Sequence, residues 1–248
     1  MRKKILITGA SSGIGKTFAY EYAKRKKDLL LVARNKKRLE EIKKDLEETH
    51  KINCEYFICD LSKPEEIKKL IIKIKNEKVD VLINNAGFGD PEYFIEADIK
   101  ITEEMINVHV LATTLLSRAV IEQMIKRNKG TIINLASIAA FTYSSISSII
   151  YNSTKRYIVQ FSKGLQHEIN KKKKNIKIQA LCPGFTRTNF NKTKIFEKTY
   201  DKIPSFLFMS SEKVVLKSIN ALDKKKVVFI PGFKNKIIVF LLKLNLYR

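Results

Sequence analysis

The residues best suited to chemistry in this chain are a tyrosine and a lysine four positions apart, Tyr151 and Lys155. They fall at the start of a predicted long helix, where this spacing places both side chains on one face. A free tyrosine has a pKa of about 10, and a neighbouring ammonium lowers that pKa by stabilising the phenolate. Such a pair could give a proton to a carbonyl oxygen or take one from an alcohol. Ser137, which follows a predicted strand, could hydrogen-bond the same oxygen or serve as an ordinary helix cap or turn residue.

A glycine-rich turn near the start of the chain indicates a site for a nucleotide phosphate. The apolar run 5–7 predicts a buried strand, residues 8–15 read Thr-Gly-Ala-Ser-Ser-Gly-Ile-Gly, and helical spacing of apolar residues follows over 14–26. Because glycines lack side chains, the backbone can approach a phosphate there, and the helix N-terminus supplies free N–H groups. The spacing is Gly-x-x-x-Gly-x-Gly, which differs from the commoner Gly-x-Gly-x-x-Gly.

Strand and helix patterns alternate along nearly the whole chain. The predicted strands are Lys4–Thr8, Leu29–Ala33, Cys54–Cys59, Val79–Asn84, Thr131–Ala136, Ile176–Cys182 and Val227–Pro231. The predicted helices are 14–26, 36–49, 64–76, about 100–127, 150–173 and 211–223. This alternation predicts an α/β fold with a parallel sheet and helices on both faces, formed by one domain over residues 1–248.

Two segments interrupt this rhythm. Residues 187–210 are rich in aromatic residues and follow the end of a predicted strand, where ligands bind in open α/β sheets, so we expect a lid over the substrate or, equally, core packing. The apolar run Ile237–Leu242 lies in a basic C-terminal stretch. It either forms a helix that covers the domain's own core or lies on a membrane surface or partner.

Charge and cysteine content restrict the classes of function. The formal net charge is +23, but the basic residues are spread over every predicted helix, with no nucleic-acid recognition motif, so we expect solvated helix faces and no nucleic-acid partner. Cys54, Cys59 and Cys182 form no Cys-x-x-Cys pair, and an odd number argues against a disulfide framework. We therefore expect a cytoplasmic protein, without a signal peptide, a transmembrane segment or a metal site.

Six short motifs occur in order and carry a family resemblance. They are Thr8-Gly9-x-x-x-Gly13-x-Gly15, Asp60-Leu61, Asn84-Asn85-Ala86-Gly87, Ser137, Tyr151-x-x-x-Lys155 and Pro183-Gly184. Together they identify the sequence as similar to the classical short-chain dehydrogenases/reductases (SDRs), over nearly its whole length. The resemblance implies a doubly wound, seven-stranded Rossmann fold that transfers hydride between a nicotinamide and an alcohol or carbonyl.

The resemblance also implies roles for individual residues. Tyr151 would be the acid in reduction and the base in oxidation, Lys155 would lower its pKa and bind the nicotinamide ribose, and Ser137 would orient the carbonyl. Asp60 and Leu61 would contact adenine, and residues 85–87 would flank its ribose. Residues 183, 184 and 186 would bracket the nicotinamide, with Thr188 near its amide or the pyrophosphate. The expected cofactor contacts are Gly9, Ser11, Ser12, Gly13, Ile14, Gly15, Arg34, Asp60, Leu61, Asn85, Ala86, Gly87, Tyr151, Lys155, Pro183, Gly184, Thr186 and Thr188. Asn84 and Asn85 would also stabilise the central sheet.

The chain departs from the family pattern in two places. His109 stands where the family places a catalytic asparagine, and Asn107 lies two residues early. A histidine there could keep the backbone carbonyl of a proton relay or shuttle protons itself, and is included among the catalytic candidates, but it could equally be a packed helix residue. The interval from Ser137 to Tyr151 is one residue longer than usual, so the loop 141–148 must absorb the difference.

The end of the second strand bears on the choice of cofactor. It reads Val32-Ala33-Arg34-Asn35, without the carboxylate that would bind the ribose hydroxyls of NAD. Arg34 could pair with a 2′-phosphate, which predicts NADP(H), or could merely stack on adenine.

The activity expected from these features is an NADP(H)-dependent carbonyl reductase acting on a small, apolar molecule. Two alternatives remain: a 3-oxoacyl-thioester reductase of fatty-acid synthesis, whose basic surface would attract an acidic carrier protein, and a non-catalytic nucleotide sensor on the same fold. The helices near 100–127 and 150–173 commonly pair in this family, so a homodimer or homotetramer is expected.

Overall fold

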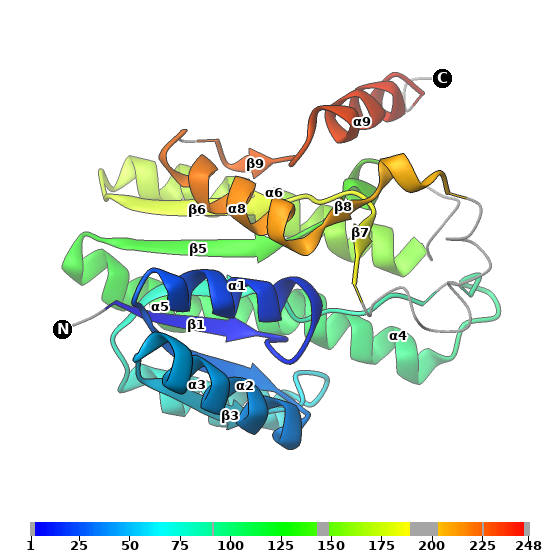
Figure 1. The fold of residues 1–248 in the computed structure, drawn as a ribbon. Helices are drawn as coiled ribbons and strands as arrows, with labels where there is room; N and C mark the ends of the chain where they lie inside the picture. The colour runs from blue at the N-terminus through cyan, green and yellow to red at the C-terminus, as the bar shows by residue number, and fades with distance from the viewer. Residues whose placement is uncertain (1–2, 91, 143–148, 189–202, 225, 246–248) are drawn as a thin grey trace.

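A seven-stranded parallel sheet forms the centre of the protein (Figure 1). The computed structural model describes residues 3–90, 92–142, 149–188, 203–224 and 226–245. The strand order is β3-β2-β1-β4-β5-β6-β9, and every neighbouring pair is parallel. The strands are β1 (Lys4–Thr8), β2 (Asp28–Ala33), β3 (Cys54–Ile58), β4 (Val79–Asn84), β5 (Gly130–Leu135), β6 (Ile176–Leu181) and β9 (Val228–Phe229). The predicted doubly wound parallel sheet is confirmed.

Helices cover both faces of this sheet. Helices α1, α2 and α8 pack on one face, and α3, α5 and α6 pack on the other. Their bounds are α1 (Gly13–Lys24), α2 (Lys36–His50), α3 (Pro64–Lys75), α5 (Thr113–Arg127), α6 (Ile149–Lys171) and α8 (Ser211–Ala221). With both faces covered, the central strands are continuously apolar: Leu29, Leu30 and Leu31 are all fully buried and alternate between the two cores.

The order in which strands are added to the sheet reverses between β1 and β4. From β1 the chain builds outward through β2 to β3, then returns to place β4 on the other side of β1. Ile7 lies between Leu31 of β2 and Ile83 of β4, and the helices that follow β1 and β4, α1 and α5, cover opposite faces of the sheet. Such a switch point is where open α/β sheets bind ligands.

The predicted helix over 100–127 exists but contains a wider turn. It consists of α4 (Ile99–Ile106), a π-helical turn η1 (Asn107–Ala112) and α5. Among the described residues this is the one helix long and apolar enough, by length and composition alone, to cross a membrane. Its inner side chains, including Leu116, Val120 and Met124, are buried against the sheet. The length and apolar composition of this helix are therefore those of a helix that packs on the core.

The last part of the chain lies beside the carboxyl ends of β5 and β6. A short pair of strands, β7 (Thr186–Arg187) and β8 (Met209–Ser210), frames the turn η4 (Ser205–Leu207), and α9 (Phe233–Asn245) follows β9. Val239 of α9 is buried against η2 (Ile138–Phe141). This helix therefore covers part of the domain's own core, which was one of the two roles expected for the run Ile237–Leu242. Most of the predicted lid, residues 189–202, and most of the loop 141–148 lie outside the described residues.

Candidate active site

The glycine turn joins β1 to α1 in a conformation that requires glycine. Gly9 and Gly13 have φ values of +64° and +53°, in the left-handed region. A Cβ at Gly15 would lie 2.3 Å from the carbonyl oxygen of Gly9, closer than any real contact. Ser12 is the N-cap of α1 but its side chain makes no capping hydrogen bond, so the first N–H groups of the helix have no such partner. Ser11 is half-buried and Ile14 is buried beside this turn. The turn therefore offers the uncapped helix N-terminus that a phosphate site needs.

Thr8 holds the loop after β4 against this turn. Its hydroxyl accepts hydrogen bonds from the backbone N–H groups of Asn85 (2.9 Å) and Ala86 (3.0 Å). The Asn85 side chain donates to the Thr8 carbonyl at 2.9 Å and to the Gly9 carbonyl at 3.2 Å. The two predicted nucleotide loops are therefore one hydrogen-bonded unit.

Asn84 points into the sheet and away from the turn. Its side-chain amide donates to the Asn134 side chain at 2.8 Å and to the Ser117 hydroxyl at 3.1 Å, and Asn134 in turn donates to Ser162 at 3.0 Å. All four side chains are buried, and they link β4, β5, α5 and α6. Asn84 thus has the sheet-stabilising role anticipated for it.

Lys155 and Tyr151 meet at the end of β5. The Lys155 ammonium lies 5.5 Å from the centre of the Tyr151 ring and donates to the Leu135 carbonyl at 3.0 Å. Lys155 is almost completely buried, and this burial lowers its pKa to about 7. Ser137 follows two residues after Leu135, is half-buried, and accepts a hydrogen bond from the Ala139 N–H at 3.1 Å. Ser137 therefore caps η2 while it lies at the same strand end as the pair.

Two connections close the opposite side of the site. The Ile138 N–H donates to the Pro183 carbonyl at 3.0 Å, which ties the loop after β6 to the loop after β5. The Thr186 hydroxyl donates to the Gly184 carbonyl at 2.9 Å. A Cβ at Gly13 would lie 3.2 Å from the Thr188 Cβ, so Thr188 sits directly on the glycine turn.

The adenine side of the predicted site lies at the ends of β2 and β3. The Arg34 guanidinium is mostly exposed and lies 3.8 Å from a carboxylate oxygen of Asp60, a loose ion pair. Asp60 accepts hydrogen bonds from the Ser62 N–H (3.0 Å) and hydroxyl (2.8 Å), while Leu61 is buried. The structure thus brings Arg34, Asp60 and Leu61 together at one edge.

His109 lies in the π-helical turn and joins three parts of the site. Its Nε2 accepts a hydrogen bond from the Phe88 N–H at 3.2 Å, so the neutral ring carries its proton on Nδ1. That nitrogen donates to the Thr154 hydroxyl at 2.9 Å, which donates to the Tyr151 carbonyl at 2.9 Å. Burial, together with the charge of Lys155, holds the pKa of His109 well below its usual value. With both nitrogens engaged and no exposed surface, His109 is better suited to positioning than to shuttling protons. The Asn107 side chain instead donates to the Ser62 carbonyl at 2.9 Å.

Two residues of this network carried no signal in the sequence. Thr154 stands inside the Tyr-x-x-x-Lys motif, but nothing in its type reveals its bond to His109. Asn235 of α9 is buried, and a Cβ at Gly184 would lie 2.3 Å from its side-chain oxygen. Only the tertiary fold brings residue 235 to residue 184.

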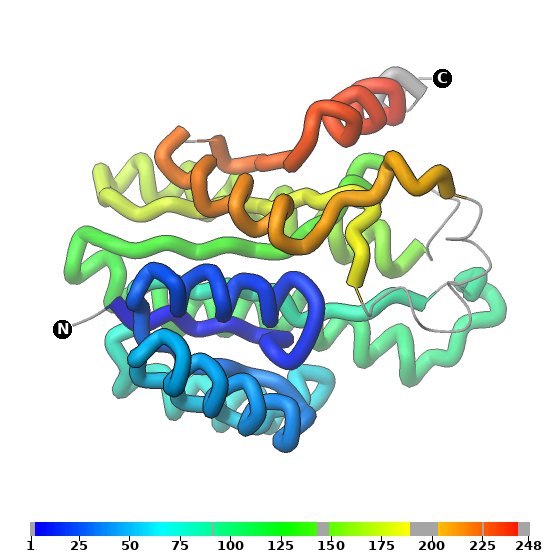
Figure 2. Tube along the Cα trace, viewed as in Figure 1, coloured from blue at the N-terminus to red at the C-terminus, as the bar shows by residue number. Residues whose placement is uncertain are grey.

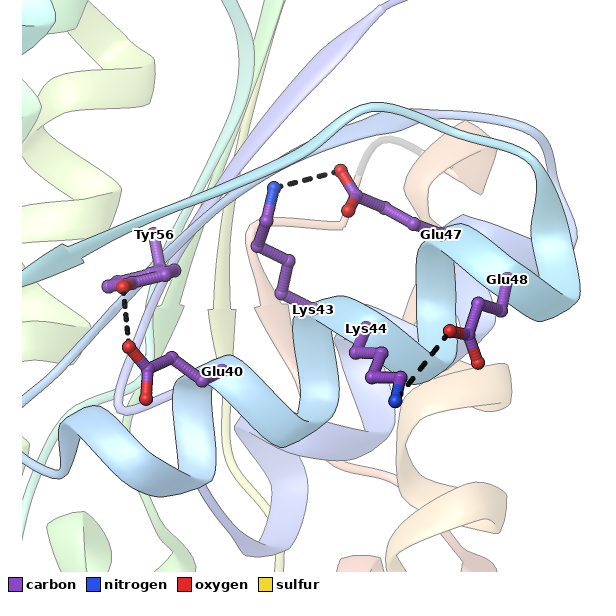
Figure 3. Close-up of a pocket in the computed structure, with 6 residues that line it drawn as sticks. All are labelled: Glu40, Lys43, Lys44, Glu47, Glu48 and Tyr56. Atoms are coloured by element: carbon purple, nitrogen blue, oxygen red, sulfur yellow. Dashed lines mark hydrogen bonds and ion pairs between the residues drawn. The ribbon is translucent and has the colours of Figure 1, made fainter.

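A hollow of about 380 Å³ lies elsewhere, on the outer side of α2 and β3 (Figure 3). Its charged side chains face one another: Lys43 donates to Glu47 at 2.9 Å, and the Tyr56 hydroxyl donates to Glu40 at 2.9 Å. These pairs join neighbouring surface side chains of α2 and β3 to one another. Within the described part of the chain, no cluster of three His, Cys, Asp or Glu side chains could hold a metal ion.

The fold and this site define a doubly wound α/β protein with a glycine-rich turn and a Tyr–Lys pair at the carboxyl edge of its sheet, and known proteins resemble it in sequence and fold. A family model described as short chain dehydrogenase matches residues 3–198. The NADP-dependent 3-hydroxy acid dehydrogenase of Schizosaccharomyces pombe is 38% identical over 193 residues, covering 76% of this chain and 73% of that protein. The very-long-chain 3-oxoacyl-CoA reductase of Anas platyrhynchos is 32% identical over 202 residues, covering 79% of this chain and 63% of that protein. The chain thus spans less than two thirds of the latter's length.

A solved structure has the same fold. The short-chain dehydrogenase from Sphingobium yanoikuyae in complex with NADPH superposes with a TM-score of 0.86 at 29% identity, over 99% of this chain and 95% of that one. The chain therefore belongs to the short-chain dehydrogenase family, as the six motifs predicted. That membership is consistent with the predicted class, an NAD(P)-dependent oxidoreductase acting on CH–OH groups.

A first prediction concerns His109. Replacing it with Phe leaves the part-buried Phe88 N–H without its acceptor and the Thr154 hydroxyl with only the Tyr151 carbonyl, so the free energy of unfolding should fall by about 2–4 kcal/mol in urea titrations. Glutamine can still accept from the Phe88 N–H, so His109→Gln should keep kcat within about tenfold, because positioning is retained. A folded His109→Gln protein that loses more than about a hundredfold in kcat would instead indicate a proton relay through the imidazole.

A second prediction concerns the pH dependence of stability. The unfolded chain protonates Lys155 up to a pKa of about 10.4, whereas the folded protein does so only up to about 7. Between these values the unfolded state binds more protons, so wild-type stability should rise with pH relative to Lys155→Met, by at most about 1.4 kcal/mol per pH unit. Urea unfolding at two pH values in this window measures the difference. Lys163→Met, at an exposed position on the same helix, should leave the pH dependence of stability as it is in the wild type. If the stabilities of wild type and Lys155→Met change equally with pH, Lys155 does not lose its proton in this window.

Proposed function

We propose that the protein is an NADP(H)-dependent reductase that interconverts a carbonyl and an alcohol, with Tyr151 as the acid or base. The observation that carries the proposal is the Lys155 ammonium buried 5.5 Å from the Tyr151 ring, at the strand end that also bears Ser137. Burying a lysine without a carboxylate partner lowers the stability of the fold. Titratable groups with such strongly shifted pKa values are found mostly at functional sites.

The surrounding residues fit a phosphorylated nicotinamide dinucleotide. The uncapped N-terminus of α1 suits the pyrophosphate, and Thr188 lies against the same turn. Arg34 is exposed at the end of β2, where its 3.8 Å pair with Asp60 is loose enough to let it turn toward a 2′-phosphate. The names of the Schizosaccharomyces pombe and Sphingobium yanoikuyae proteins, which include NADP and NADPH, support this choice.

When bound, the nicotinamide supplies or accepts the hydride. Tyr151 gives a proton to the carbonyl oxygen in reduction and takes it back in oxidation, while Ser137 orients that oxygen by a hydrogen bond. The charge of Lys155 stabilises the phenolate that Tyr151 becomes. Because the pKa of Lys155 is about 7, this lysine can itself give and take a proton near neutral pH and so restore the proton on Tyr151.

The substrate is apolar. Tyr93, Phe94 and Ile95, between β4 and α4, are exposed, as is Phe206 in η4 beside β8. Exposed apolar side chains of this kind suit a lipophilic substrate. The second candidate, a reductase of long 3-oxoacyl thioesters, is favoured by the name of the Anas platyrhynchos relative. Faster NADPH oxidation with 3-oxoacyl thioesters than with free ketones would select it.

The setting of the enzyme also belongs to this proposal. The thiols of Cys54, Cys59 and Cys182 are buried and free, and burial raises the pKa of each to about 12, which suits a reducing cytoplasm. A homodimer or homotetramer formed through α5 and α6 would leave the carboxyl edge of the sheet open, as the reaction requires. A lid formed by residues 187–210 remains part of the hypothesis.

The acid–base role of Tyr151 can be tested against a matched tyrosine on the same helix. Tyr151→Phe removes the reacting hydroxyl and should lower kcat about a thousandfold while NADPH binding stays nearly unchanged. Tyr157→Phe removes a hydroxyl that hydrogen-bonds Thr114 at 2.7 Å and should keep its activity. NADPH oxidation over a panel of ketones, aldehydes and oxoacyl thioesters measures both. Activity that survives in Tyr151→Phe would refute the mechanism, and a wild type inactive on every substrate would favour the nucleotide sensor.

The cofactor preference can be tested at Arg34. Arg34→Ala should lower the ratio of kcat/KM for NADPH to that for NADH by about tenfold to a hundredfold, because a charge-assisted hydrogen bond contributes about 1.5–3 kcal/mol. Lys44→Ala, further along α2, removes a positive charge without reaching the end of β2 and should leave the ratio unchanged. An unchanged ratio in Arg34→Ala would mean that this arginine only stacks on adenine.

A further inference from the structure

We propose that α9 binds the surface of an anionic lipid bilayer through an outer apolar face that the domain leaves uncovered. The inner face of this helix packs on the core, where Val239 and Asn235 are buried. The outer face consists of Phe233, Ile237, Phe240 and Leu241, whose exposed fractions are 75%, 43%, 62% and 54%. A helix that is apolar on both sides needs a second partner besides its own core.

The arrangement of residues around α9 matches a bilayer interface. At about 100° per residue, the four outer side chains fall within an arc of roughly 100°. Lys234 borders this arc on one side and Lys236 on the other, and both are exposed. Lysines in this position can reach lipid headgroups while the apolar face enters the boundary with the acyl chains.

Charge selects the kind of surface. Residues 224–248 contain seven Lys or Arg and no Asp or Glu. Basic segments beside an apolar helix face are attracted to the negative potential of anionic lipids. The apolar face can insert between the lipids, and the basic residues are attracted to anionic headgroups. Both contributions strengthen the binding of interfacial helices to a bilayer.

The same charge argues against a second copy of the chain on this face. A two-fold contact places each patch on itself, so the basic borders of one α9 would oppose those of the other. Each chain also carries a formal charge of +23, which disfavours self-association through a basic surface. An anionic bilayer meets both the apolar and the basic character of α9.

The helix lies beside the predicted site. Figure 2 shows α9, in red, at the outer border of the fold and extending toward the carboxyl ends of the strands. Asn235 contacts Gly184, and the Lys234 ammonium lies 4.7 Å from the ring centre of the exposed Phe206. Docking α9 on a bilayer therefore brings the carboxyl edge of the sheet close to molecules dissolved in the membrane.

Vesicle sedimentation tests the proposal on the full chain. We expect wild-type protein to bind phosphatidylcholine vesicles containing about 30% phosphatidylserine at least about tenfold more tightly than pure phosphatidylcholine vesicles, at about 0.15 M salt. Phe240→Ser/Leu241→Ser should weaken binding to the anionic vesicles at least about tenfold. Ile72→Ser, which changes an equally exposed apolar side chain on α3, should stay within about twofold of wild type. Circular dichroism and the urea midpoint confirm that each variant is folded.

Three results would overturn the assignment. The first is no binding of the wild type to anionic vesicles. The second is equal binding of Phe240→Ser/Leu241→Ser and wild type, which would mean that the general positive charge adsorbs the protein without α9. The third is a wild-type dimer, seen by light scattering, that this double variant converts to monomers, which would mean that a second copy covers the face.

Discussion

The site depends on the hydrogen bonds between Thr8 and the loop after β4. That loop leaves the sheet at the point where the strand order reverses, and nothing in β4 itself dictates its direction. Once the Thr8 hydroxyl holds the N–H groups of Asn85 and Ala86, Gly87 and Phe88 follow at a defined place. Phe88 then meets His109, and His109 reaches Thr154 and the first turn of α6. One hydroxyl therefore begins a series of contacts that connects the glycine turn to Tyr151, the proposed catalytic residue.

Polar groups in this region lie where an ordinary core would be apolar. Asn84, Asn134, Ser117 and Ser162 are linked by hydrogen bonds across the sheet, although the buried Asn84 Oδ1 accepts none from the described residues, and His109 is fully buried. A lysine whose pKa has fallen to about 7 has lost most of its hydration without gaining a carboxylate partner among its described contacts. The buried polar groups around Tyr151 thus lower the stability of the folded protein while they fix the side chains of the site in place, as is common at active sites.

Much of the fold was predictable because a parallel sheet covered on both faces needs continuous apolar strands, and the glycine turn has few alternative explanations. The motif residues came together as expected because the carboxyl ends of adjacent strands share one edge. The π-helical turn, the pairing of His109 with Thr154 and the contact of Asn235 with Gly184 were not predictable, because each depends on how distant segments pack. The same holds for α9: its composition left two roles open, and the structure shows an inner face that packs and an outer face that does not.

The contact between Asn235 and Gly184 has a consequence for how the protein is made. The loop at residues 183–184 emerges from the ribosome some fifty residues before the side chain that supports it. Strands β1 to β5 can form during synthesis once β6 has been made, since all their pairing strands are then present, whereas β6 still lacks β9. The predicted nicotinamide side of the site is completed only when the chain reaches α9. A nascent chain can therefore hold a nearly finished sheet while the proposed active site still lacks its contact with α9.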